Sequence, residues 1–248
     1  MKRIFFTLFS SIFISITLFS QTPTDWLIDG APYKAELKQA KGSRSFFLQN
    51  GLISREFSLY KNPSTIGFEN LMTGETIIRG IKPEGEITIN GKHYNIGGLV
   101  GQPNYAFLKK DWIKDMHEAP NSLIFKRMQD GKIKPNIKWK KVRHAQNETW
   151  PPKGIHLEMT YTVPKRNWIE VSVHYEIYDQ LPVICKWISV KNTGKENIVI
   201  NKFVNEILAT VEYSSRVEDR GATFETPNIH VETDYAFGGM TVANSSLK

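Results

Sequence analysis

The chain has 248 residues, of which 40% are hydrophobic and 23% charged, and its formal net charge is +7 at pH 7. This length and apolar content allow one large or two small domains with a sizeable core, and they exclude a largely disordered chain. Cys185 is the only cysteine, so an intrachain disulfide is excluded and the core has to hold the fold together.

The N-terminus predicts a secretory signal peptide over residues 1–20. Lys2 and Arg3 precede an apolar run, and the small Ser20 is the expected cleavage point. A transmembrane anchor is the alternative, but a span needs roughly 20 predominantly apolar residues. We therefore expect an exported protein, periplasmic or extracellular, without a membrane anchor.

The remaining chain reads as an N-terminal arm over residues 21–44 and one all-β domain over residues 45–248. Side chains alternate between apolar and polar with period two, which is typical of antiparallel strands that bury one face. About ten short strands predict a β-sandwich. The expected strands include 46–48, 52–59, 65–68, 123–128, 137–143, 156–163, 167–178, 183–190 and 197–203.

Two hairpins are expected from the turn sequences. Asn90-Gly91 divides residues 87–96, and this dipeptide tolerates the positive φ angles of a type I′ turn. The strand over residues 156–163 is expected to pair with 167–178 across a short loop that contains Pro164.

Helical spacing is confined to two stretches, so one or two short helices are expected. In residues 106–116 Leu108, Trp112 and Met116 lie four apart, which predicts a short amphipathic helix. Residues 202–212 carry a weaker stripe, and their β-branched content favours a strand.

A basic stretch lies at residues 132–144, where lysines surround Trp139. Such a stretch can line a groove for single-stranded nucleic acid. The preferred interpretation is an edge strand over Ile137 to Arg143 whose lysines prevent aggregation. No nucleic-acid partner is expected.

Candidate catalytic groups are few. His174 and Glu176 share the polar face of one strand and could act as general base and acid on a sugar-binding sheet, although any half-exposed strand shows this pattern. Asp111 and Asp115 form a second carboxylate pair on the expected helix, beside lysines that favour a solvated face. Ser189 lies outside any nucleophile-elbow sequence. No cofactor or metal site is indicated, and a bound calcium ion stays open.

Aromatic residues in irregular segments are candidate carbohydrate contacts, because sugars stack on exposed rings. Trp150, which precedes two prolines, is the leading one, followed by Tyr105 and Trp112 with the neighbouring Asp111. The alternative for Trp112 is a place in the core, on the apolar stripe of the expected helix.

Four stretches resemble a known family: "VHYEIYDQLPVICKWISVKNTGKENIVI" (173–200), "NGLISREF" (50–57), "NLMTGETIIRGIKPEG" (70–85) and "GGLVGQPNYAFLKKDW" (97–112). They are similar to segments of the N-terminal β-supersandwich domain of melibiase-type α-galactosidases, glycoside hydrolase family 36. The resemblance implies a galactose mutarotase-like sandwich that supports a catalytic barrel.

In that family the catalytic aspartates lie on a (β/α)₈ barrel, so the resemblance carries no catalytic residue over to this chain. It implies a fragment truncated before the barrel, with a galactoside-containing glycan as its expected ligand and a homo-oligomer left open. The region 97–112 and the Trp150 loop are the candidate rim of the sugar site. Two rivals remain: a free-standing carbohydrate-binding module, and a small mutarotase-like enzyme that uses His174 and Glu176.

Overall fold

A computed structural model describes residues 25–42, 44–103, 106–140 and 149–211. The predicted signal peptide and the last part of the predicted sandwich domain lie outside these ranges. Within them, no helix is long and apolar enough to cross a membrane.

The described chain is almost entirely β-structure, as predicted. Its only helical element is the 3₁₀ turn η1 (Lys110–Trp112). The strands are β1 (Glu36–Gln39), β2 (Ser45–Gln49), β3 (Ile53–Ser58), β4 (Ser64–Asn70), β5 (Glu75–Thr76), β6 (Ile78–Gly80), β7 (Gly85–Ile89), β8 (Lys92–Ile96), β9 (Leu99–Val100), β10 (His117–Glu118), β11 (Ile124–Lys132), β12 (Gly154–Val163), β13 (Arg166–Tyr178), β14 (Ile184–Asn192), β15 (Ile200–Val204) and β16 (Ala209–Thr210).

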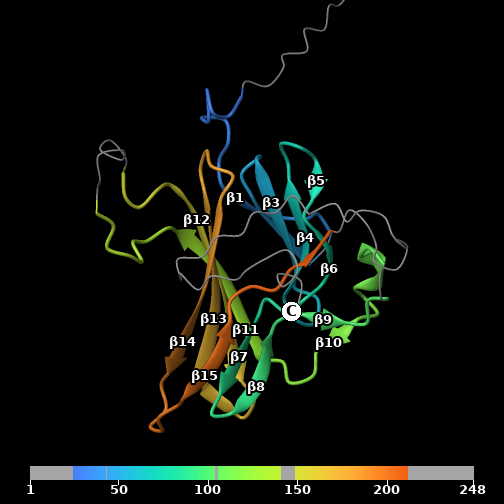
Figure 1. The fold of residues 1–248 in the computed structure, drawn as a ribbon, viewed down its shortest axis with the longest axis vertical. Helices are drawn as coiled ribbons and strands as arrows, with labels where there is room; N and C mark the ends of the chain where they lie inside the picture. Colours follow the sequence, from blue (N-terminus) through green and yellow to red (C-terminus); the bar gives the residue numbers. More distant parts are fainter. Residues whose placement is uncertain (1–24, 43, 104–105, 141–148, 212–248) are drawn as a thin grey trace, which may run out of the picture.

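The strands form an antiparallel β-sandwich. The longest strands make one sheet in the order β11-β12-β13-β14. Figure 1 shows the sheet β1-β2-β3-β4-β5 beside the upper part of this long sheet and the sheet β15-β7-β8 beside its lower part. One hydrophobic core joins these three sheets, since its buried residues include Phe57 of β3, Ile87 of β7 and Val173 of β13. Two further sheets have two strands each, β10-β9 and β16-β6.

Period-two alternation explains which faces are buried. On β13 Ile169, Val171, Val173, Tyr175 and Ile177 are all fully buried. The residues between them point to the opposite side of the long sheet, which contains most of its polar side chains. The alternation in the sequence therefore predicted correctly which side of β13 is buried and which is polar.

Both predicted hairpins are confirmed. Asn90 and Gly91 have φ angles of 50° and 75° and connect β7 to β8, as a type I′ turn requires. β12 and β13 pair along their length, and the register is irregular next to the turn, between Thr162 and Val163.

Two local predictions are wrong in extent. The helix expected over residues 106–116 is only the η1 turn, because the segment before it is extended: the Leu108 N–H donates to the Arg79 carbonyl. The edge strand expected over 137–143 is absent from its described part, residues 137–140. Pro135 has no N–H to extend the ladder of β11, and the Trp139 ring stacks on Trp150.

A buried ionic network connects the sheets. The Arg55 guanidinium on β3 binds both carboxylate oxygens of Glu206, at 2.7 and 3.1 Å, and lies 3.3 Å from Glu84. Lys186 of β14 lies 2.8 Å from Glu206. The Tyr175 hydroxyl of β13 donates to Glu84, and its ring centroid lies 4.7 Å below the Arg55 guanidinium.

The charges of this network balance, since two cations face two carboxylates. Burial by itself would raise the pKa of Glu206, but the hydrogen bond from Arg55 and the charges of Arg55 and Lys186 lower it. Burial lowers the pKa of Lys186, and both carboxylates oppose that shift. Each ion therefore depends on its partners, because an unpaired charge at this depth is strongly unfavourable.

Replacing Arg55 by leucine is expected to lower the free energy of unfolding by about 3–5 kcal/mol, because the buried Glu84 and the partly exposed Glu206 lose their main counter-ion. Urea unfolding measures this change. Lys34→Ala is the matched control, since it removes the exposed Lys34–Asp179 pair and is expected to cost at most about 1 kcal/mol. Equal losses in the two variants would contradict a central role for Arg55.

Candidate functional site

The candidate site lies on the outward side of the sheet β11-β12-β13-β14, which we call the polar face. Strand register sets its side chains in rows. One row runs across the sheet from Glu158 of β12 to His174 of β13 and Trp187 of β14. The next row pairs His156 of β12 with Glu176 of β13. Because neighbouring positions in antiparallel strands bring side chains on one face close together, these five residues form one cluster.

Three rings form the centre of this cluster. The imidazoles of His156 and His174 are parallel within 11°, and Nε2 of His156 lies 3.0 Å from Nδ1 of His174. A ring nitrogen donates or accepts in the plane of its ring, so the two imidazoles lie side by side. The Trp187 ring is parallel to both within 12°, with centroids 4.9 Å from His174 and 5.6 Å from His156. Trp187 therefore covers the histidine pair.

Hydrogen bonds fix the rings and the neighbouring carboxylate. Nε2 of His174 lies 2.7 Å from the Ser189 hydroxyl, so both nitrogens of this ring have partners. Glu158 accepts hydrogen bonds from Ser172 and from Gln129, each at 2.7 Å. The cluster is held by four strands.

Electrostatics keep His174 neutral over a wider pH range than an exposed histidine. Burial lowers the pKa of His174, Glu158 opposes this shift, and His156 adds to it. Burial would raise the pKa of Glu158, but hydrogen bonds from Ser172 and Gln129 lower it. Burial raises the pKa of Glu176 although Tyr178 donates a hydrogen bond to it. The two carboxyl groups are thus shifted in opposite directions.

A hollow of about 300 Å³ lies over the cluster. Gly131 of β11 leaves room beside His156, since a Cβ atom there would meet nothing within 4 Å. The segment after β11 makes one wall with Lys134, Pro135 and Asn136. This volume is at the lower end of the range for small-molecule sites.

The arrangement suits a polar ligand with one apolar face. An aromatic ring, three carboxyl groups, two amides, two lysines and imidazole nitrogens surround the hollow, which supplies both stacking and hydrogen-bonding groups. Among the described residues, no group of three or more His, Cys, Asp or Glu side chains could hold a metal ion. The chemistry on view is hydrogen bonding and proton exchange at His174.

Only some of the candidate residues predicted from the sequence lie close together in the structure. His174 and Glu176 lie together on the polar face. Trp150 is 36% exposed and stacks on Trp139, with ring centroids 5.4 Å apart.

The other carbohydrate candidates lie elsewhere or outside the description. Trp112 packs against a second apolar cluster near η1, as its core alternative predicts, and Asp111 is exposed beside it. The η1 region and the segment that leads into β12 lie on opposite sides of the molecule in Figure 1. Tyr105 lies outside the described residues. The predicted rim therefore does not form one cluster with Trp150.

Sequence reasoning missed His156, Glu158 and Trp187 as members of the site. His156 and Glu158 alternate with buried residues of β12, so this alternation together with the observed register would have brought them to His174. Trp187 was not among the candidates, and it lies on the outward side of β14, opposite His174. The signal that could have identified it is alternation: Trp187 lies two residues before Ser189, and the apolar Ile188 and Val190 alternate with these two positions.

Comparisons with protein families, with curated proteins and with solved structures find no match to this chain. The site must therefore be interpreted from its own residues.

Replacing His174 by glutamine is expected to weaken the pH dependence of stability between about pH 7.5 and pH 5. A lowered pKa in the folded state means that the unfolded chain binds the proton first, so stability falls as the pH drops below about 6.5. Thermal unfolding at several pH values measures this slope. The exposed His93→Gln on β8 is the control and should keep the slope of the unmodified chain. An unchanged slope in His174→Gln would contradict the assigned environment.

Proposed function

We propose that this chain is a non-catalytic β-sandwich domain of an exported α-galactosidase-like glycoside hydrolase, and that its polar face binds carbohydrate. The observation that most supports carbohydrate binding is the Trp187 ring over His156 and His174 in a hollow lined by Glu158 and Glu176. The family assignment itself rests on the sequence resemblance.

The chemistry of the cluster supports a sugar as ligand. A pyranose ring presents an apolar C–H face, which packs on an aromatic ring, and an edge of hydroxyl groups, which bind carboxylates and amides. Glu158 and Gln129 lie together at one side of the hollow and offer acceptors and donors in fixed positions. Side chains held by strands lose little freedom on binding, which favours affinity.

A supporting role beside a catalytic barrel fits the same proposal. In α-galactosidases of family 36 the catalytic aspartates belong to the barrel, so a sandwich domain contributes contacts and positioning. The proposed partners are therefore a barrel domain and a galactoside-containing glycan. A homo-oligomer fits this role too.

Replacing Trp187 by alanine is expected to weaken binding of a galactose-containing oligosaccharide at least about tenfold, because the stacking surface is lost. Titration calorimetry or affinity electrophoresis in galactomannan gels measures it. Trp168→Ala is the matched control: Trp168 is 37% exposed, lies in β13 and is not among the residues that line the hollow. The proposal fails if the unmodified chain binds no such glycan or if the two variants bind alike.

A second candidate function is sugar anomerisation of the mutarotase type, which the hydrogen-bond chain Ser189–His174–His156 favours. A neutral His174 can take up a proton from a sugar hydroxyl through the Ser189 hydroxyl and return it by the same route. Polarimetry on freshly dissolved galactose tests it. Under the leading proposal the chain neither speeds anomerisation nor cleaves a chromogenic α-galactoside. Anomerisation that His174→Ala abolishes would establish the second function in its place.

A further inference from the structure

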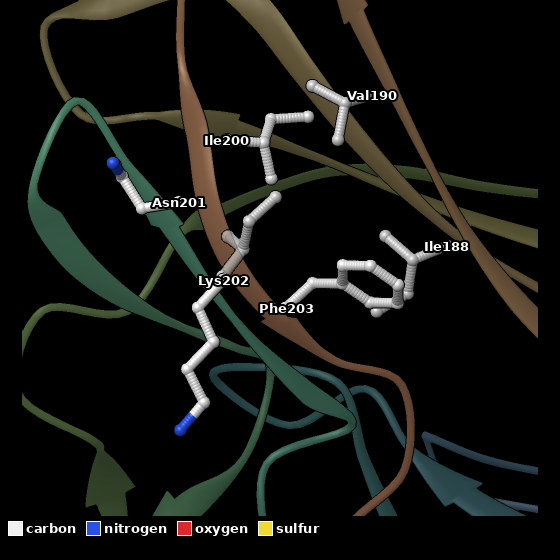
Figure 2. Close-up of a pocket in the computed structure, with 7 residues that line it drawn as sticks. Ile188, Val190, Ile200, Asn201, Lys202 and Phe203 are labelled. Atoms are coloured by element: carbon white, nitrogen blue, oxygen red, sulfur yellow. The ribbon is translucent and has the colours of Figure 1, made fainter. Parts of the chain in front are cut away.

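An apolar groove of about 650 Å³ opens along one side of the sandwich, between β14 and β15. Figure 2 shows Ile188 and Val190 of β14 on one side of the groove and Ile200 and Phe203 of β15 on the other. Ile200 and Phe203 are 46% and 63% exposed, respectively. Contiguous apolar side chains with this exposure mark an interaction surface.

Both strands that border the groove have an open edge in the described part of the chain. β14 is the last strand of the long sheet, and β15 is the first strand of the sheet β15-β7-β8. The carbonyl of Lys186 accepts a hydrogen bond from the Asn205 side chain, so Lys186 directs its backbone groups away from β13. In an antiparallel sheet the backbone N–H and C=O groups of every second residue point to the same edge of the strand. The N–H and C=O groups of Ile188 and Val190 therefore face the open edge.

These backbone groups specify the kind of occupant. Within the described residues, no backbone hydrogen bond beyond the sheet ladder reaches Ile188 or Val190. Two alternate residues whose N–H and C=O groups face one open edge are a template for an added strand. The side chains of Ile188 and Val190 point into the groove, so that strand needs apolar residues at alternate positions facing the same side.

The chain itself contains a segment with this pattern, "IHVETDYAF", residues 229–237, outside the described residues. Its alternate positions are Ile229, Val231, Thr233, Tyr235 and Phe237, with His230, Glu232, Asp234 and Ala236 between them. Pro227 precedes it and Gly238-Gly239 follows it, which is how strands are bounded in sequence.

Charge and reach agree with this occupant. With its apolar side turned to the groove, the segment would place Glu232 and Asp234 on the outward side, where the neighbouring β14 carries Lys191. The described chain ends at Val211. Residues 212–228 can span roughly 55 Å when extended, more than the radius of gyration of about 18 Å expected for a folded chain of this length. The connection is therefore long enough to reach the groove.

We propose that residues 229–237 add as a strand to the open edge of β14 and close the groove with the apolar side chains of Val231, Tyr235 and Phe237. The added strand satisfies the backbone groups of Ile188 and Val190. It also covers Ile200 and Phe203. The groove is thus an intramolecular docking site for the chain's own C-terminal part.

Amide hydrogen exchange of the full chain tests this proposal. In the unmodified chain the amides of Ile188 and Val190 are expected to be protected. The double variant Val231→Asp/Tyr235→Asp places two charges against the groove, and exchange at Ile188 and Val190 should accelerate at least about tenfold as the edge becomes exposed. Slow exchange of Met159 and Val173 in the core then shows that the sandwich remains folded.

The matched control is His230→Asp/Ala236→Asp, which introduces two aspartates into the same segment on its outward side. It is expected to leave the protection of Ile188 and Val190 in place. Rapid exchange of both amides in the unmodified chain would overturn the proposal. Protection that survives Val231→Asp/Tyr235→Asp would overturn it as well. If that protection increases with protein concentration and light scattering shows a dimer, a second copy of the chain covers the groove.

Discussion

The bidentate contact between Arg55 and Glu206 is the interaction on which the arrangement of the sheets most depends. The two residues are 151 positions apart in sequence, and each belongs to a different part of the sandwich. Around them Glu84 and Lys186 complete a neutral set of four charges, and Tyr175 contributes both its hydroxyl and its ring. Removing Arg55 or Lys186 would be costly, because the buried Glu84 would lose part of its charge compensation.

β14 connects this network to both of the surfaces described above. Its inward side chains are Lys186, which belongs to the network, followed by Ile188 and Val190, which line the groove. Its outward side chains include Trp187 and Ser189, which complete the cluster on the polar face. The ionic network therefore fixes the position of the strand that carries Trp187. A small displacement of β14 would separate the Trp187 ring from the histidine pair.

Much of the fold follows from local sequence. Period-two alternation identified the long strands and their buried faces, and Asn90-Gly91 identified a tight hairpin, because both signals arise from backbone geometry. The helix expected near Trp112 is only a single turn in the structure, because the Leu108 N–H donates to the Arg79 carbonyl and the segment before the turn is extended. Helical periodicity in a short segment is a weak signal when a neighbouring strand competes for its backbone.

The sequence by itself determined that His174 and Glu176 share the outward face of one strand. Only the tertiary structure decided their neighbours. Extending the pairing of Val163 with Arg166 would set His156 opposite the buried Val173, whereas the irregularity at Thr162 and Val163 sets it opposite Glu176. That shift, and the meeting of Arg55 with Glu206, depend on packing between residues far apart in the chain. Alternation fixes which side a residue faces, but register and long-range partners are chosen by the free energy of the whole core.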